Sequence, residues 1–549
     1  MLKKMNKLNK SNTVISICIM LMVILGVTSC EDLNKYPLDS LSTGTFWKTE
    51  TDAMLGLTGI YNNPHLQGNY NFWSQLGCLY LFEATTDNGF EKDNQVTDIN
   101  NGYLASTYGA IRNAWVDAYQ KIARCNNLID NIDAVAMNPD KLAAMKSEAR
   151  VIRAHDYFYL SFYWGDVPFT THLLSVNEAN NIARTPKSEV VAFVIKELQE
   201  SIEKLPVTRP DSEYGRITKG GALAILGRVF LAEKRWEDAK AVYKQIIDLG
   251  IYIIDPRFKE IFEEKGETSK EHILVSVRMQ DLFGTPMQRG CLGFDFGGYH
   301  WFSPYNELVE DFECIDGKPI SESPLYNPEN PYKDRDPRLY KTIGINGLSV
   351  IKGKLYISHP DSSAVTYQDQ VTRRPWSGYL LNKFIDEGYT GNIISYGGDF
   401  PMIRYAEVLL SYLEACVESH TTITQSLLDE TINKVRGREA VKMPPVTETD
   451  PVKLTAILRR ERRVELAWEG LRLYDLFRWH TAHVNLKGTF TGMKVCSKAD
   501  AANYKTVKVD AKGYYYCEET NFRENVDYLW PIPQTERDVN PNLTQNPGY

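Results

Sequence analysis

The sequence of 549 residues predicts a mainly α-helical body, built from packed helix pairs and interrupted by a loop-rich region with a few short strands. Two observations support this fold class. Apolar residues recur every three to four positions in several long segments, which is the period of one helix face. Between about residues 280 and 400, by contrast, glycine, proline, tyrosine and tryptophan are frequent, a texture typical of long loops.

The chain begins with the features of a secretion signal. Its first twelve residues contain four lysines and no acid, and residues 14–27 form an almost unbroken apolar run of 14 residues. A helix needs about 20 residues to cross the hydrocarbon core of a membrane. A shorter apolar run behind a basic head is typical of a signal peptide. We therefore predict that residues 1–29 are removed, and a true membrane anchor is the alternative.

The run ends at Val27-Thr28-Ser29-Cys30, which resembles the lipobox of bacterial lipoproteins. There the cysteine thiol accepts a diacylglyceride, and stable attachment needs more than one acyl chain. We expect acylated Cys30 and a flexible tether over residues 30–45. Glu31 and Asp32 resemble the export tag of surface lipoproteins in the Bacteroidetes. The predicted location is the outer membrane, lipid-anchored and facing the cell exterior, with a periplasm-facing lipoprotein as the alternative.

The composition excludes some functions. The formal net charge is −8, and removal of the signal takes away lysines only. Such an acidic body argues against nucleic-acid binding, which needs a basic face. Seven widely spaced cysteines remain besides Cys18 and Cys30, and the sequence has no CxxC motif. It therefore indicates neither a disulfide framework nor a zinc site, and we expect mostly small buried cysteines.

Two long helices are predicted between about residues 115 and 169. In the first, Ile122, Cys125, Leu128 or Ile129, and Ile132 recur at helical spacing. The second, "MKSEARVIRAHDYFYLSFYWG", stops at a glycine with a proline shortly beyond, which are helix end signals.

A helix pair is predicted in "LAILGRVFLAEKRWEDAKAVYKQII". The spacing of Gly227, Phe230, Ala239 and Tyr243 fits the tetratricopeptide repeat, in which small residues let two helices approach. An arbitrary helical hairpin is the alternative. Because a helix pair buries its apolar face only against neighbours, such units form a stacked scaffold.

Two later segments are helical and rich in charge. One is "PMIRYAEVLLSYLEACVE", expected to be a helix beginning near Pro401 that carries Arg404, Glu407 and Glu414. The other contains "ERRVELAWEG", interpreted as a structural charge run in which exposed pairs contribute about 0–1 kcal/mol each. We expect the tryptophans on helical faces to pack in the interior: Trp115, Trp164, Trp236, Trp468 and Trp479.

Several motifs together resemble the SusD/RagB family of outer-membrane nutrient-binding lipoproteins, and they run in family order from Cys30 to Tyr549. They are the lipobox, "YQKIARCNNLID", "EARVIRAHDYFYL" with "YWGDVPF", "GRITKGGALAILGRVFLAEKRWEDA", "DRDPRL", "PMIRYAEVLLSYLEA", "INKVRGREA", "LRRERRVELAWEGLRLYDLFRW" and "YLWPIPQTERDVNPNLTQNPGY". The resemblance implies a helical region over 46–270 with tetratricopeptide-like units, and a region over 271–549 with ligand-binding insertions and closing helices. It also implies a protein that caps a SusC-like TonB-dependent transporter and hands it an oligosaccharide or polysaccharide, or sometimes a peptide.

No catalytic motif is present: the sequence has no GxSxG, HExxH, P-loop or dinucleotide fingerprint. We therefore predict a binding protein and no enzyme, with no cofactor. Calcium cannot be predicted, because no spacing of oxygen ligands indicates it. His480 and His483 stand i, i+3, and we interpret them as a helix-end pair without a metal.

Sugar binding without catalysis favours aromatic rings on loops, because a ring stacks on the apolar face of a sugar and offers a polar edge. Tyr299 and Trp301 lie in the glycine-rich "FGGYHWFSP", and Trp376 follows Pro375. Near the start, aromatic residues flank "TTDNGFEKDN", whose short polar side chains suit sugar hydroxyls. The full set of candidates is Trp73, Asp87, Asn88, Phe90, Tyr103, Tyr299, Trp301 and Trp376. The alternative is a helical-repeat lipoprotein that binds peptide or assembles the transporter, which an apolar helical groove with few exposed rings would favour.

Overall fold

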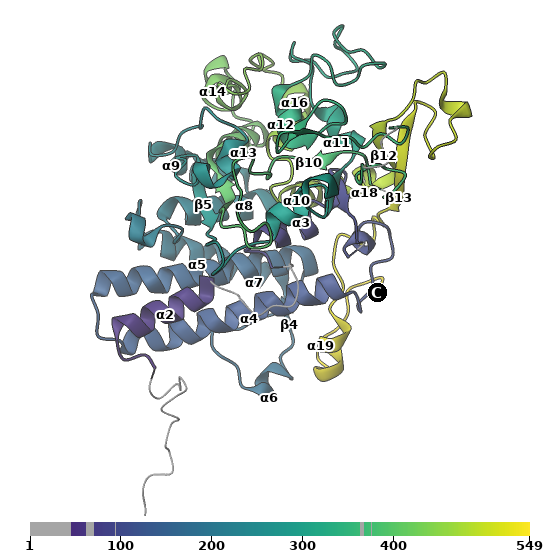
Figure 1. The fold of residues 1–549 in the computed structure, drawn as a ribbon. Coiled ribbons are helices and arrows are strands. Elements are labelled where there is room, and N and C mark those ends of the chain that lie inside the picture. Colours follow the sequence, from purple (N-terminus) through teal and green to yellow (C-terminus); the bar gives the residue numbers. More distant parts are fainter. Residues whose placement is uncertain (1–45, 62–70, 94, 363–366, 375) are drawn as a thin grey trace, which may run out of the picture.

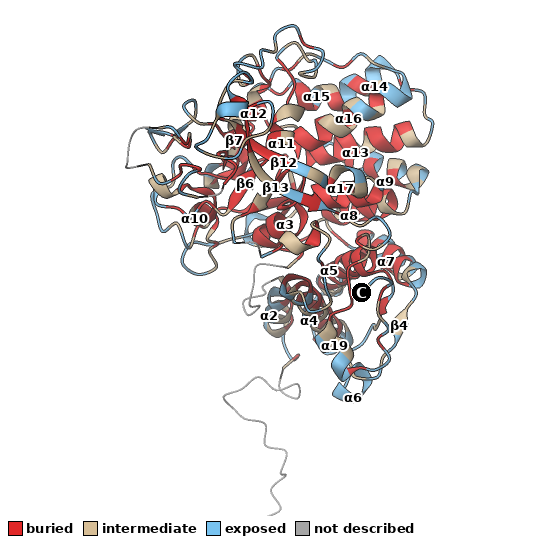
Figure 2. Cartoon of the chain, turned by 90° about the vertical axis from the view of Figure 1, so that its right-hand side faces the viewer, coloured by how far each residue is buried: buried red, intermediate tan, exposed pale blue. Residues whose placement is uncertain are grey.

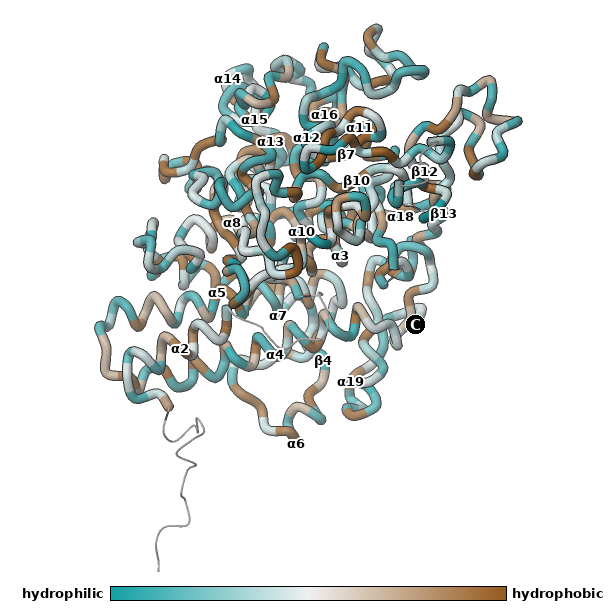
Figure 3. Tube along the Cα trace, viewed as in Figure 1, coloured by the Kyte–Doolittle hydropathy of each residue, from teal (hydrophilic) through white to brown (hydrophobic). Residues whose placement is uncertain are grey.

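A computed structural model describes residues 46–61, 71–93, 95–362, 367–374 and 376–549 (Figure 1). The predicted signal peptide, Cys30 and the tether lie outside these residues. Within the described part, hydrophobic and hydrophilic residues are interleaved along the long helices (Figure 3). No helix there combines the length and the apolarity that crossing a membrane requires.

The long helices form a continuous stack, which confirms the predicted helical-repeat scaffold (Figure 1). Each helix packs on the next and buries its apolar face there. In packing order they are α2 (Glu50–Tyr61), α4 (Gly109–Asn131), α5 (Pro139–Trp164), α7 (Lys187–Ile202), α8 (Lys219–Ala232), α9 (Trp236–Asp248), α13 (Tyr405–Glu418) and α16 (Pro451–Glu465).

The α8–α9 pair shows why the repeat spacing predicts this fold. A Cβ atom on Gly227 would lie 2.5 Å from the Tyr243 ring, so only glycine lets the two helices approach this closely. Ala239 and Phe230 are buried in the same interface. The predicted helix pair is therefore confirmed.

The two long helices predicted between about residues 115 and 169 also follow their sequence signals. In α4, Leu128 is buried and Ile129 is only partly buried, which settles the choice between them. Helix α5 begins at Pro139 behind Asn138, whose side chain accepts hydrogen bonds from two backbone N–H groups. It ends before Gly165, whose φ of 75° suits glycine.

Short elements connect the stack and carry the loops. The short helices are α3 (Gln75–Phe82), α6 (Val176–Ala179), α10 (Met287–Cys291), α11 (Asn306–Asp311), α12 (Pro337–Thr342), α14 (Gln425–Glu430), α15 (Ile432–Arg436), α17 (Arg472–Arg478), α18 (Ala482–Asn485) and α19 (Gln534–Val539). The strands are β1 (Thr85–Thr86), β2 (Gly89–Glu91), β3 (Val167–Pro168), β4 (Arg184–Thr185), β5 (His272–Ser276), β6 (Phe302–Pro304), β7 (Ile343–Gly344), β8 (Val350–Ile351), β9 (Lys354–Leu355), β10 (Leu380–Leu381), β11 (Phe400–Arg404), β12 (Lys487–Lys494) and β13 (Tyr514–Asn521).

The sheets are small, as predicted for the loop-rich region. Strands β1, β2 and β6 form a three-stranded antiparallel sheet, and the other described strands pair in twos. The hairpin of β12 and β13 extends from the upper body (Figure 1). Residues 280–400 contain mostly turns and loops, which confirms the loop-rich region predicted from the sequence.

Two sequence predictions need correction. The helix expected near Pro401 begins at Tyr405, because residues 400–404 form strand β11 against β5. Arg404 therefore extends from a strand end, from which it reaches several acids at once. Trp468 is buried as expected, but it lies in the turn between α16 and α17 with φ 65° and not on a helix. Trp115 and Trp164 are buried, whereas Trp236 and Trp479 are partly buried.

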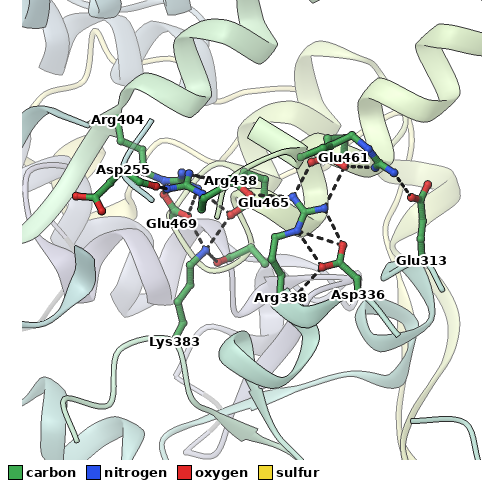
Figure 4. Close-up of polar contacts among 12 residues, drawn as sticks. Asp255, Glu313, Asp336, Arg338, Lys383, Arg404, Arg438, Glu461, Glu465 and Glu469 are labelled. Atoms are coloured by element: carbon green, nitrogen blue, oxygen red, sulfur yellow. Dashed lines mark hydrogen bonds and ion pairs between the residues drawn. The ribbon is translucent and has the colours of Figure 1, made fainter. Parts of the chain in front are cut away.

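The charge run "ERRVELAWEG" is structural, as predicted. Its ion pairs are buried, however, so the small stabilisation expected of exposed pairs does not describe them. Figure 2 shows α8, α13 and α17 mostly buried. Glu465 lies at the centre of an ion network, where its carboxylate accepts from Arg338 at 2.8 Å, Arg404 at 2.7 Å and Arg438 at 3.0 Å (Figure 4). Burial would raise the pKa of Glu465, but these guanidinium groups lower it below its usual value.

The network joins segments that are far apart in sequence. Its further members are Asp336, Glu461, Glu271, Glu469, Lys383, Arg436 and Glu313, all buried. Positive and negative side chains alternate, so each buried ion has an oppositely charged partner. The attraction between the partners offsets the free-energy cost of removing each ion from water. This network, which we call the ion core, fastens the loop-rich region to α13 and α16.

Candidate functional site

Two aromatic candidates lie on one patch of the loop-rich region, and a third lies behind it. We call this patch the loop face and define it by Arg289, Phe294, Tyr299, Trp301 and Arg374. Its first segment turns back on α10, because the N–H of Tyr299 donates to the Arg289 carbonyl and the N–H of Trp301 donates to the Gly290 carbonyl, both at 2.7 Å. Trp376 lies directly behind the patch.

The two central aromatic residues differ in exposure and lie on either side of a buried histidine in the chain. Tyr299 is 39% exposed and Trp301 is partly buried, whereas His300 between them is fully buried. The Arg289 guanidinium lies 3.9 Å from the centre of the Tyr299 ring, a cation–π contact that braces it. Trp301 packs on Gly290, where a Cβ atom would come within 2.4 Å of the indole.

Behind these rings, Trp376 forms part of a layered stack. Arg374 lies 3.7 Å from the centre of the Phe294 ring, Phe294 stacks on Trp376 at 5.4 Å, and Trp376 contacts His300 at 4.3 Å. Trp376 is only 2% exposed. It therefore supports the loop face from within, and Phe294 lies between Trp376 and the Arg374 guanidinium.

A buried acid fixes this stack. The Asp369 carboxylate accepts the backbone N–H groups of Phe294 and Asp295, both at 3.0 Å, and lies 3.3 Å from Nδ1 of His300. Burial would raise the pKa of Asp369, but the His300 contact and these N–H donors lower it. The loop face is thus pre-organised by groups that a ligand does not have to move.

Phe90 lies on the strand next to the loop face, and Tyr103 lies apart from it. Strand β2 pairs with β6, and the N–H of Lys92 donates to the Trp301 carbonyl at 2.9 Å. Phe90 is partly buried and stacks on Tyr305 at 5.3 Å. Tyr103 is 76% exposed on the loop before α4.

Asp87 and Asn88 make contacts inside the protein. Asp87 is buried and pairs with Arg472 at 2.7 Å, while the Asn88 side chain bonds Glu83 and Arg463. Burial would raise the pKa of Asp87, but Arg463 and Arg472 lower it to about 2. Both side chains hold the turn after α3 against α16 and α17, so we leave them out of the proposed binding surface.

Trp73 lines a separate apolar pocket of about 330 Å³. Its ring meets His155 edge-on at 4.7 Å, and the Lys121 ammonium lies 5.7 Å from the ring centre. Among the described residues, none that defines the loop face lines this pocket. Its other lining residues are Met54, Leu57, Thr58, Tyr61, Asn71, Tyr214, Gly215, Arg216, Val275, Ser276, Val277, Arg278, Met279 and Phe283.

Glu267 and Asp399 are neighbouring acids whose pKa values are raised above those of ordinary surface carboxylates. Burial, and then the charge of Asp399, raise the pKa of Glu267 to about 7. Burial raises the pKa of Asp399 to about 6. Raised values of this kind occur in general acids and also in structural clusters, and burial raises the pKa of Glu83, Glu91 and Glu307 to about 7 as well. Substitution of Glu267 is therefore one test for catalysis among these acids.

Sequence reasoning missed the cations and Phe294 of the loop face. Arg289, Phe294 and Arg374 lie beside the predicted aromatics in the chain, within "QRGCLGFDFGG" and "TRRPW". A search for arginines close to loop aromatics would have found Arg374, two residues before Trp376. The stacking of Arg374 on Phe294 depends on a contact between residues about 80 positions apart, which spacing alone does not reveal.

Comparison with known proteins places the chain among one group of relatives. The model described as the SusD family matches residues 271–549, and one described as "Starch-binding associating with outer membrane" matches residues 60–231. The crystal structure of a SusD-like carbohydrate-binding protein from Bacteroides fragilis is 36% identical and superposes with a TM-score of 0.85, covering 91% of this chain and 100% of its own.

Curated relatives span nearly the whole chain as well. SusD-like protein P2 of Formosa agariphila is 25% identical over 552 residues, which is 96% of this chain and 98% of that protein. Starch-binding protein SusD of Bacteroides thetaiotaomicron is 23% identical over 586 residues, 95% of this chain and 96% of that protein. The match therefore covers the helical stack and the loop-rich region together.

Proposed function

The chain belongs to the SusD family, and on that premise we propose that it is an outer-membrane lipoprotein that captures an oligosaccharide or polysaccharide without catalysis. Cys30 carries the lipid, the body faces the cell exterior, and a SusC-like TonB-dependent transporter receives the ligand. The description of the matching family model, starch-binding and associated with the outer membrane, supports the ligand class and the location.

The observation that carries the proposal is the braced ring pair of the loop face. Tyr299 and Trp301 expose ring surface on a rigid support, and such rings stack on the apolar face of a sugar. Arg289 and Arg374 place guanidinium groups beside the rings. Because a guanidinium has five N–H donors, it can also donate to sugar hydroxyls at the edge of the platform.

The expected affinity for one sugar chain is modest. Each stacked ring contributes about 1 kcal/mol beyond area burial, so two or three rings give weak binding. A long polymer that meets many anchored copies on one membrane binds much more tightly, because each further contact is intramolecular. Membrane anchoring is therefore part of the capture mechanism.

Affinity electrophoresis tests the ligand class. The full chain in detergent is run through native gels that contain plant, fungal or host polysaccharides. We expect retardation by one class of glycan, weakened by Tyr299→Ala and unchanged by Tyr516→Ala, which alters a partly buried tyrosine on strand β13 outside the loop face. Migration unaffected by every glycan, with the protein folded, would contradict the proposal.

A turnover assay tests the absence of catalysis. The polysaccharide that retards the protein is incubated with it, and reducing ends are measured over time. We expect no increase. Release of reducing ends that Glu267→Gln abolishes would identify an enzyme and overturn this part of the proposal.

A second candidate function, peptide binding, is favoured by the pocket at Trp73. Its walls are mostly apolar, and Lys121 and Arg278 place positive groups around them, whereas Arg216 is paired with Glu148 and Glu213. An extended peptide with an acidic group suits such a pocket better than a sugar does. A fluorescent acidic peptide library whose binding is lost in Trp73→Ala and kept in Tyr299→Ala would favour this function over glycan capture.

A further inference from the structure

A cluster of two histidines and one glutamate lies on the surface away from the loop face. His480 follows α17, His483 lies in α18, and Glu524 lies on the chain that leaves β13. Their ligand atoms all lie within 4.8 Å of one another. Nε2 of His483 is 3.4 Å from Oε1 of Glu524, and Nε2 of His480 is 4.0 Å from the same oxygen.

Glu524 distinguishes this cluster from an ordinary pair of histidines at a helix end. Two histidines at i, i+3 are usually a helix-end pair, as the sequence analysis predicts. Glu524 is distant in sequence, and only the fold brings it to both rings. Its side chain is 53% exposed and that of His480 is 59% exposed, so an ion can enter from solvent.

Tyr528 orients both imidazoles. Its ring stacks on His480 at 4.3 Å, and its hydroxyl lies 2.9 Å from Nδ1 of His483. With Nδ1 of His483 engaged by this hydroxyl, Nε2 is the nitrogen that faces Glu524. A second partner that fixes the unused nitrogen in this way is typical of metal-binding histidines.

We propose that His480, His483 and Glu524 bind a Zn²⁺ ion. Two imidazole nitrogens and a carboxylate form a donor set that zinc prefers, whereas calcium and magnesium prefer oxygen ligands alone. Tetrahedral zinc with ligands at about 2.0–2.1 Å separates neighbouring ligand atoms by roughly 3.3 Å. His483 and Glu524 have nearly this spacing already, and His480, now 4.0 Å from Glu524, would have to move closer to become the third ligand.

The ion would staple two parts of the chain. It would fasten the α17–α18 corner to the segment after β13, which leads to Trp530 and its stack on Tyr163. The fourth coordination position faces solvent and holds water. This site is independent of the proposed glycan surface, so either one can exist without the other.

Zinc titration tests the site. The full chain in detergent, without a polyhistidine tag and freed of metal by chelator, is titrated with ZnCl₂ by calorimetry, and its melting temperature is measured with and without zinc. The variants are His480→Ala, His483→Ala and Glu524→Gln. The matched control is His420→Ala, because His420 is exposed and has φ 56°, close to the 55° of His480.

We expect one zinc ion per chain in the wild type and in His420→Ala, with a zinc-dependent rise in melting temperature. Each histidine variant is expected to weaken binding by at least about tenfold, since loss of an outer-shell partner alone costs 10–100-fold. Glu524→Gln keeps the side-chain size and should also weaken binding.

Two results would overturn the proposal. One is a wild type that takes up no zinc and shows no shift of melting temperature. The other is zinc binding that survives in the double variant His480→Ala, His483→Ala, which would place the ion elsewhere, for example on the partly exposed Cys496 and Cys517. Cobalt(II), whose absorption spectrum reports tetrahedral nitrogen and oxygen ligands, distinguishes this site from a thiolate site.

Discussion

Arginine has different roles in the ion core and in the loop face, and the partner decides which role it has. In the ion core, Arg338, Arg404 and Arg438 are almost fully buried and bond carboxylates from distant segments. In the loop face, Arg289 and Arg374 are partly exposed and lie over aromatic rings.

The difference separates stability from binding. A buried guanidinium with several carboxylates fixes the relative position of the segments it joins, and loss of one partner leaves an uncompensated buried charge. A half-exposed guanidinium over a ring orients that ring and keeps free N–H donors for a ligand. Changes in the ion core should therefore alter folding, and changes in the loop face should alter ligand affinity.

The largest effect is expected for Glu465→Ala in the ion core. The substitution leaves three buried guanidinium groups short of a carboxylate, which should lower the free energy of unfolding by about 3–5 kcal/mol. Urea denaturation measures it. The matched control is Glu439→Ala, whose pair with Lys442 is exposed and should cost about 0–1 kcal/mol. Equal losses in the two variants would contradict the role of the ion core.

The second-largest effect is expected when acid protonates the carboxylates of the buried ion pairs. Burial would raise the pKa of Glu414, but Arg478 lowers it to about 2, and the pKa of Asp87 is also about 2. Because the folded-state pKa values lie below those of the unfolded chain, near 4, the stabilisation is present above pH 4 and is lost as the pH falls toward 2. Unfolding monitored by circular dichroism across this range checks it.

The role of Glu414 in this acid transition can be isolated. In Glu414→Gln the side chain no longer ionises, so the fall of stability between pH 4 and 2 should be shallower than in the wild type. An unchanged slope would show that this buried acid does not contribute.

Gly290→Ala tests whether the loop face is pre-organised. The added methyl would lie 2.4 Å from the Trp301 indole, so the ring has to move. Such overpacking typically costs about 1–3 kcal/mol of stability, and we expect a clear loss of glycan affinity as well. Gly297→Ala is unsuitable as a control because of its φ of 83°, but Gly109→Ala meets no neighbouring atom and should leave affinity unchanged.

Tyr299→Ala should give the smallest change in free energy and the cleanest separation of the two regions. Loss of one stacked ring, about 1 kcal/mol, weakens glycan binding roughly fivefold. The ring is partly exposed and belongs to a surface loop, so stability should change by about 0.5 kcal/mol or less. Calorimetric titration together with urea denaturation of the same variant separates the two quantities. A large loss of stability with unchanged affinity would show that Tyr299 contributes to folding, as the ion core does, and not to binding.

The helical scaffold could be predicted because its signals are local. The spacing around Gly227 and Tyr243, the glycine end of α5 and the apolar period of α4 each depend on neighbours within a few turns. The burial of Glu461 and Glu465 could not be predicted, since their partners Arg338, Arg436 and Arg438 come from segments that only the fold brings together. A dense charge run looks the same in sequence whether it is solvated or buried.

The candidate site was predicted in part for the same reason. Glycine-rich context correctly indicated that Tyr299 and Trp301 lie on an irregular loop, and the structure leaves both partly exposed. The same context around Trp376 gave no sign that Phe294 and His300 would cover its ring. The short polar side chains of Asp87 and Asn88 suit sugar hydroxyls, but Arg463 and Arg472, which bond them, are nearly 400 residues away in the sequence.

Whether the loop face binds the glycan can be measured by titration of paired variants. The polysaccharide that retards the wild type is titrated into the double variant Tyr299→Ala, Trp301→Ala and, in parallel, into Trp73→Ala. We expect the double variant to lose binding while it remains folded, with a lower urea midpoint because the packing of Trp301 on Gly290 is lost. Trp73→Ala is expected to bind normally. Full affinity in the double variant, with loss in Trp73→Ala, would contradict both expectations and place the site in the apolar pocket.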